Sequence, residues 1–184
     1  SSIGYCEEFW TPDRVDMMAY YKDSNGIHFT VPVVRPIGWS PKGHFAYVVE
    51  NAVEGRGGVL FSYIIMSAVT DKILWRFDDD WENGDSGIIE ASMKRSGSKV
   101  APQLEKYNII QGGGTKLYKF PLKHGGYTYS PDLVLTKKAE PHPFLGSIQS
   151  MVAYIKQNYK KKRITRVKEA NAFSYWVSGY FHSP

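Results

Sequence analysis

The sequence predicts an α+β fold, in which two helical segments pack on a mostly antiparallel β-sheet of about six to eight strands. Aromatic residues make up 15% of the 184 residues, and aromatic rings pack well on a pleated sheet. Short runs of β-forming residues recur between turn-forming residues, and apolar residues follow a helical spacing in two stretches. The length and a hydrophobic content of 42% predict a single domain over residues 1–184.

The N-terminal part gives the weakest pattern. Residues 1–26 indicate only a short helix that ends before the turn pair Asn25–Gly26. His28–Val34 is rich in β-forming residues and favours a strand. Because Pro32 cannot donate a hydrogen bond to a ladder, we expect either an edge strand or only a short strand here.

The stretch 37–77 predicts a three-stranded antiparallel meander. A turn at Ser40–Gly43 has proline at its second position and glycine at its fourth, and it leads into a strand at His44–Glu50. Two further strands are predicted at Val59–Val69 and Lys72–Phe77. The first two strands are apolar on both faces, so we expect them in the centre of the sheet.

The first helical segment is expected over about Ser86–Tyr107. Its apolar residues fit helical spacing, but Ser96–Ser98 and Pro102 interrupt the pattern, which predicts one kinked helix or two short ones. A hairpin follows, with strands at Thr115–Leu122 and Tyr127–Lys137.

The second helical segment is expected after Pro143. Its apolar residues are spaced by 3, 4, 3 and 4 positions, which describes one face of an α-helix: Leu145, Ile148, Val152, Ile155 and Tyr159. Lysines and an arginine follow, where a helix dipole favours cations. Two more strands are predicted at Ile164–Lys168 and Phe173–Phe181.

A resemblance to a known repeat covers residues 37–77. It rests on the runs Trp39–Gly43 (WSPKG), Phe45–Tyr47 (FAY) and Val69–Lys72 (VTDK). Together these runs resemble one WSPDG-type β-propeller repeat, with Lys42 and Asp71 in place of the usual Asp and Gly. The pattern does not recur in the chain, so the resemblance implies one such hairpin and not a full propeller.

The order of elements, with a late GYFHSP strand, is similar to that of uncharacterised bacterial secreted or cell-envelope proteins. This resemblance implies a periplasmic or extracellular location, and it brings no known active site. The single cysteine, Cys6, excludes an intramolecular disulfide and a cysteine-based metal site. No apolar stretch reaches the roughly 18 residues that suggest a transmembrane segment.

The net charge of +5 is concentrated at the C-terminal end. From Met151 to Pro184 there are seven Lys or Arg residues against one acid, Glu169, whereas the rest of the chain is nearly neutral. The candidate polyanion-binding residues are Lys156, Lys160, Lys161, Lys162, Arg163, Arg166 and Lys168. Such a cluster could bind nucleic acid or an anionic membrane surface, or it could be a solvated helix end.

Other candidate sites match their motifs poorly. The acidic run Asp78–Asp85 lacks the spacing of a calcium-binding EF-hand loop and is interpreted as a polar loop that leads into the first helix. Gln111–Lys116 lacks the residue order of a phosphate-binding loop. The five histidines show no metal-ligand spacing, and no nucleophile motif is present. We therefore expect no metal, no cofactor and no enzymatic activity.

These observations predict a non-catalytic secreted or cell-envelope domain with a binding or structural role. Its partner would be a protein at the cell envelope, although no motif identifies one. The alternative is a protein that binds polyanions through the basic segment 156–168.

Overall fold

The computed structural model describes residues 33–53, 58–81, 88–112, 115–142, 146–168 and 180–181 of the chain. These residues divide into two compact units, one comprising 33–117 with Phe181 and the other comprising 118–180. The division leaves the single domain over 1–184 as a prediction. The elements predicted within 1–32, and most of the strand predicted at Phe173–Phe181, lie outside the described residues.

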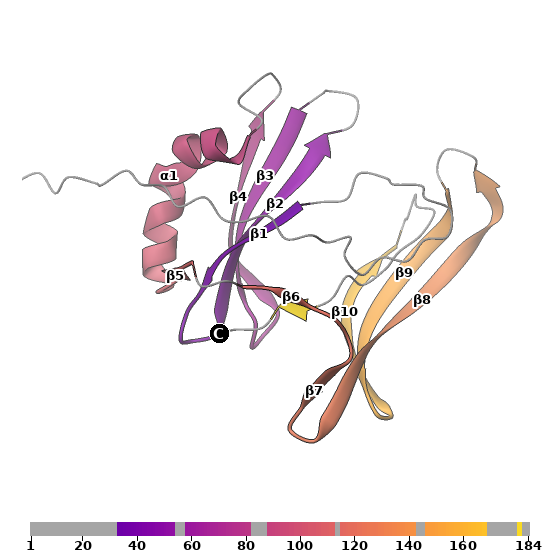
Figure 1. The fold of residues 1–184 in the computed structure, drawn as a ribbon. Coiled ribbons are helices and arrows are strands. Elements are labelled where there is room, and N and C mark those ends of the chain that lie inside the picture. The colour runs from indigo at the N-terminus through magenta and orange to yellow at the C-terminus, as the bar shows by residue number, and fades with distance from the viewer. Residues whose placement is uncertain are drawn as a thin grey trace, which may run out of the picture. The chain divides into compact units, whose positions relative to one another are not determined.

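The first unit contains a five-stranded antiparallel sheet (Figure 1). Its strands are β1 (Val33–Trp39), β2 (His44–Val53), β3 (Gly58–Ser67), β4 (Lys72–Trp81) and β5 (Ile110–Gln111). They lie in the order β4-β3-β2-β1-β5. The pairing of β2 with β3 and of β3 with β4 confirms the three-stranded meander predicted within 37–77.

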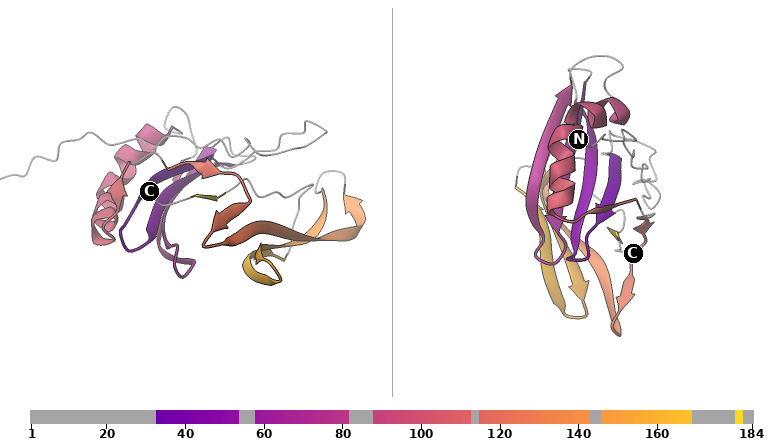
Figure 2. Two further views of the ribbon diagram at one scale, coloured as in Figure 1. Left: turned by 60° about the horizontal axis from the view of Figure 1, so that its bottom comes forward. Right: turned by 90° about the vertical axis from the view of Figure 1, so that its left-hand side faces the viewer.

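One helix, α1 (Ile89–Lys106), follows β4 and packs along one face of the sheet, as Figure 2 shows. The segment predicted as one kinked helix or two short ones is a single helix that contains Pro102. The helix ends at Tyr107, after which Asn108 adopts a left-handed φ of 53°.

The core of the first unit lies between α1 and the sheet. Strand β3 contributes Phe61, Tyr63 and Ile65, which share a face because side chains two residues apart point the same way. The helix contributes residues at helical spacing, namely Ile89, Met93, Val100 and Leu104. Each fully buried side chain of this size stabilises the fold by about 1.5–3 kcal/mol relative to the exposed state.

The opposite face of the sheet carries a row of aromatic rings. The Trp39 and Phe45 rings stack with their centroids 4.3 Å apart, and the Phe45 and Tyr47 rings stack at 5.0 Å. The Trp39 indole N–H donates to the Thr115 hydroxyl at 3.1 Å. Strand β2 therefore has apolar residues on both faces, which confirms its predicted central place.

A close approach of two backbones joins β5 to β1. The register pairs Gly38 with Gln111, and a Cβ at position 38 would meet the carbonyl oxygen of Ile110. Only glycine therefore fits here. The Gly112 N–H also donates to the Ile37 carbonyl at 3.0 Å, so the chain leaving α1 is held at the edge of the sheet.

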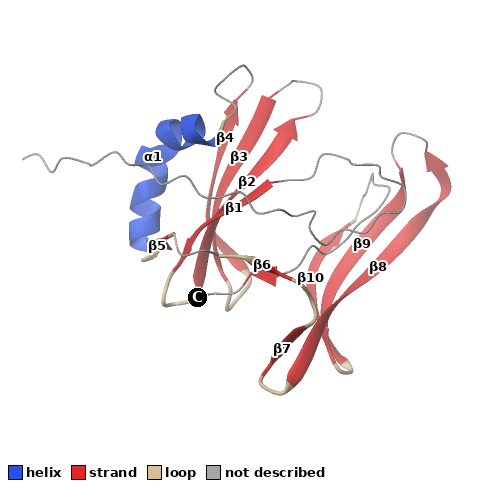
Figure 3. Cartoon of the chain, in the orientation of Figure 1, coloured by secondary structure: helices blue, strands red, loops and turns tan. Residues whose placement is uncertain are grey.

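The second unit contains a four-stranded antiparallel sheet in the order β10-β9-β8-β7 (Figure 3). Its strands are β7 (Leu122–His124), β8 (Tyr127–His142), β9 (Gly146–Gln157) and β10 (Lys160–Val167). The turn at Gly125–Gly126 joins β7 to β8, so the predicted hairpin is present, but its first strand is Leu122–His124 and not the predicted Thr115–Leu122. Two short strands, β6 (Leu117–Tyr118) and β11 (Tyr180–Phe181), form a separate pair.

The helix predicted after Pro143 is wrong, because its residues form β9. The 3, 4, 3, 4 spacing was coincidental, since the same segment also alternates with the period of a strand. Ile148, Met151 and Ala153 are buried and share one face of the sheet once the bulge near Ser150 is taken into account. Strand β9 pairs with β8 on one side and with β10 on the other, so its backbone hydrogen bonds come from the sheet.

The predicted fold class is therefore corrected. The described residues are mainly antiparallel β-sheet with one helix, and not an α+β fold with two helical segments. The strands number eleven in the described residues and lie in three sheets, against the six to eight expected.

Candidate functional site

The predicted basic residues lie on one hairpin of the second unit. Lys156 is near the end of β9, Lys168 follows β10, and the others lie on β10 itself. The side chains of Lys160–Arg166 and of Lys168 are exposed. All seven candidate residues are thus brought together by the β9–β10 hairpin, which replaces the predicted helix end.

One face of this hairpin, called here the cationic face, carries Lys156, Lys161, Arg163 and Arg166. Lys161 lies opposite Lys156 in the ladder, so their side chains share a face. A bulge after Arg163 shifts the register and returns Arg166 to that face. Without the bulge, strand alternation would place Arg166 on the opposite face.

A single acid from β8 lies among these cations. The Asp132 carboxylate is 3.0 Å from the Lys156 ammonium and 4.0 Å from that of Lys161. The Lys161 ammonium also lies 4.3 Å from the centroid of the Tyr154 ring. Within the part of the chain that the structure describes, Arg163 and Arg166 form no ion pair, so the cationic face keeps an excess of positive charge.

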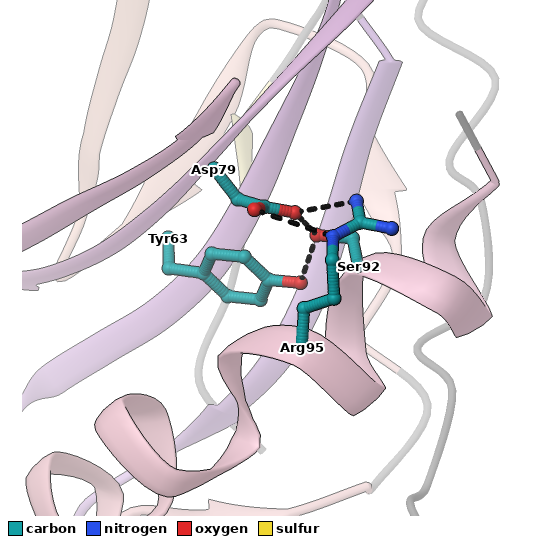
Figure 4. Close-up of polar contacts among 4 residues, drawn as sticks. All are labelled: Tyr63, Asp79, Ser92 and Arg95. Atoms are coloured by element: carbon teal, nitrogen blue, oxygen red, sulfur yellow. Dashed lines mark hydrogen bonds and ion pairs between the residues drawn. The ribbon is translucent and has the colours of Figure 1, made fainter. Parts of the chain in front are cut away.

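A polar cluster that the sequence did not predict joins α1 to the first sheet (Figure 4). The Tyr63 hydroxyl lies 2.7 Å from Ser92 Oγ, which itself donates to Asp79 Oδ2 at 2.7 Å. Because a serine has one O–H, Tyr63 must be the donor to Ser92. Arg95 Nη2 donates to Asp79 Oδ2 at 2.7 Å and completes the cluster.

The chemistry of this cluster favours a structural role. Burial raises the pKa of Tyr63 above its ordinary value of 10.0, and the negative charge of Asp79 acts in the same direction. The phenol therefore keeps its proton at neutral pH and serves as a donor. The Asp79 carboxylate accepts bonds from Ser92 and Arg95, an arrangement that fixes the helix on the sheet.

The sequence contains one indication of this cluster, namely a polar residue at a helical position that faces the core. Ser92 and Ser96 occupy such positions in α1, and both are buried. Ser96 Oγ, in contrast to Ser92 Oγ, makes no hydrogen bond to any described residue. Buried polar groups normally have partners, so Ser92 could have been expected to meet one across the sheet.

The acidic run is not the loop that was predicted, because Asp78, Asp79 and Asp80 belong to β4. Strand alternation separates their roles: Asp79 faces α1, whereas Asp78 accepts from Arg76 Nε at 2.9 Å on the opposite face. The remaining acids, Glu82 and Asp85, lie outside the described residues.

Within the described ranges, no group of three or more His, Cys, Asp or Glu side chains is placed to hold a metal ion. Cys6, His28 and His182 lie outside those ranges. None of the helices in the described part of the chain has the length and apolar content needed to cross a membrane.

Comparison with known proteins gave no match: no protein-family model, no curated protein sequence and no solved structure is similar to this chain. The resemblance of residues 37–77 to a WSPDG-type propeller repeat therefore stays a prediction. The likeness of the whole chain to bacterial secreted or cell-envelope proteins stays a prediction as well.

Proposed function

We propose that the protein is a non-catalytic binding protein that contacts polyanions through the β9–β10 hairpin. The observation that carries the proposal is the concentration of exposed cations on this hairpin. Six of them follow one another along β10 and just after it: Lys160, Lys161, Lys162, Arg163, Arg166 and Lys168. Lys156 and Lys161 share a single acid, Asp132.

Protection of a sheet edge is the competing explanation for these cations. Lysines on an edge strand discourage pairing with other chains, and β10 is an edge strand with a bulge. One or two charges are enough for that purpose. In addition, the bulge shifts the register so that Arg166 lies on the same face as Arg163. Two arginines on one face suit bidentate contacts with phosphate or sulfate.

A secreted or cell-envelope location is part of this proposal. Anionic lipids and charged polysaccharides are polyanions of that compartment.

Heparin chromatography of the full chain tests the proposal. We expect the wild-type protein to be retained and to elute only at raised salt, since each phosphate or sulfate contact releases counterions. The variant Lys160→Glu/Lys161→Glu/Lys162→Glu should elute at much lower salt or not bind.

The matched control reverses three exposed lysines of the first unit, Lys42, Lys72 and Lys94. This variant changes the net charge by the same amount as the hairpin variant. Comparing the retention of the two variants therefore separates binding by the hairpin from the effect of overall charge. Equal losses in the two triple variants would reject the hairpin as the binding site.

A further inference from the structure

The β7–β8 turn and the β9–β10 turn lie at the same end of the second unit's sheet (Figures 1 and 3). The register explains why: Tyr129 of β8 pairs with Gln157 of β9. Tyr127 lies two residues beyond this pair on β8, and Tyr159 lies two residues beyond it after β9. The turns Gly125–Gly126 and Asn158–Tyr159, with Tyr127, are called here the hairpin end.

Exposed tyrosines mark this end. Tyr159 is 91% exposed and Tyr127 is 50% exposed, although tyrosine is a large and partly apolar side chain. Exposed lysines flank the two turns: Lys160 follows Tyr159, and Lys123 of β7 pairs with Thr128, the residue after Tyr127. The hairpin end therefore presents two phenol rings at its tip and ammonium groups one or two residues further in.

We infer that the hairpin end is an interfacial anchor that binds an anionic lipid bilayer. The inference rests on the proposed polyanion binding and names its partner class. Tyrosine rings favour the headgroup level of a bilayer, where the ring meets apolar atoms and the hydroxyl stays hydrated. Lysines just behind the rings can reach lipid phosphates, and each cation near an anionic surface adds to the affinity.

The geometry favours a bilayer over a single-stranded nucleic acid. Base stacking needs open rings along a basic groove. On the cationic face the described ring is Tyr154, and the Lys161 ammonium lies over it at 4.3 Å. The exposed rings are instead at the tips of two adjacent turns, where a flat surface can meet both at once.

Flotation of the full chain with lipid vesicles tests the inference. The probes are vesicles of phosphatidylcholine with about one-third phosphatidylglycerol, and vesicles of phosphatidylcholine alone. We expect binding to the anionic vesicles only. The variant Tyr127→Ala/Tyr159→Ala should bind these vesicles roughly tenfold more weakly, because it loses the apolar contact with the interface.

Two controls separate insertion of the rings from other effects. The variant Tyr127→Phe/Tyr159→Phe keeps the rings and should bind at least as well as the wild type. Val69→Ala shortens an apolar side chain that is 74% exposed at the β3–β4 turn of the first unit, and it should change nothing.

The outcomes also separate this inference from the proposed function. Binding to heparin without binding to anionic vesicles would overturn the membrane anchor and leave polyanion binding intact. Equal vesicle binding by the wild type and the double alanine variant would overturn the role of the tyrosines. Binding to neither probe would reject both proposals.

Discussion

The hydroxyl of Ser92 connects α1 to the sheet of the first unit through two hydrogen bonds. It accepts a hydrogen bond from the buried Tyr63 and donates one to Asp79, which also pairs with Arg95. Asp79 is largely buried, and its carboxylate oxygens accept hydrogen bonds from Ser92 and Arg95. Four residues from two strands and a helix thus share one polar network inside an apolar core.

The first prediction compares two buried serines of α1. Ser92→Ala should lower the free energy of unfolding by about 1–3 kcal/mol, because Tyr63 would be left without an acceptor. Ser96→Ala removes a hydroxyl that makes no hydrogen bond to a described residue, so its effect should stay within about 0.5 kcal/mol. Urea unfolding of both variants measures the difference. Equal losses would show that the network does not stabilise the fold.

The second prediction concerns alkaline pH. The raised pKa of Tyr63 means that the folded protein holds this proton at a pH where the unfolded chain, with its ordinary value of 10.0, releases it. The stabilisation is complete below pH 10 and is lost as the pH rises towards the folded value. Tyr63→Phe lacks this term, so the stability advantage of the wild type should shrink above about pH 10. A constant difference between about pH 8 and about pH 11 in unfolding experiments would contradict the assignment.

Some secondary-structure elements could be predicted from the sequence, and others were predicted wrongly. Strands β2 and β3 were predicted from runs that are apolar on both faces between clear turns, whereas the predicted third strand, Lys72–Phe77, missed the last four residues of β4. Strand β9 was mistaken for a helix, since its apolar residues satisfy both periods and only pairing with β8 and β10 decides between them. The basic hairpin residues could be named from sequence, but their arrangement on one face depended on a bulge that no local pattern predicts.

The third prediction concerns the joint between β1 and β5. Gly38→Ala would force a methyl group against the Ile110 carbonyl and separate the two strands. We expect a loss of about 1–3 kcal/mol in stability and faster hydrogen exchange at the Gly112 amide, which donates to Ile37. The comparison is Val69→Ala, which shortens a side chain that is 74% exposed at the β3–β4 turn and should leave stability and exchange unchanged. Unchanged hydrogen exchange at the Gly112 amide in the Gly38→Ala variant would contradict the close pairing of β1 with β5.

The whole molecule combines a core-forming unit with a unit that concentrates charge. In the first unit, α1 covers a sheet and the polar cluster fixes it in place. In the second, long strands carry a hairpin with exposed cations and exposed tyrosines. Composition alone located the positive charge in the C-terminal part, but the buried cluster depends on contacts between remote segments and could not be read from it.

The most direct test of the central claim is the salt dependence of binding to a short DNA duplex, used as a polyanion probe. If Lys160, Lys161 and Lys162 contact the polyanion, the slope of log affinity against log salt should fall in magnitude by about 3 in the triple glutamate variant. The triple variant of Lys42, Lys72 and Lys94 should keep the wild-type slope. A slope that the hairpin substitutions leave unchanged would contradict polyanion binding by the β9–β10 hairpin.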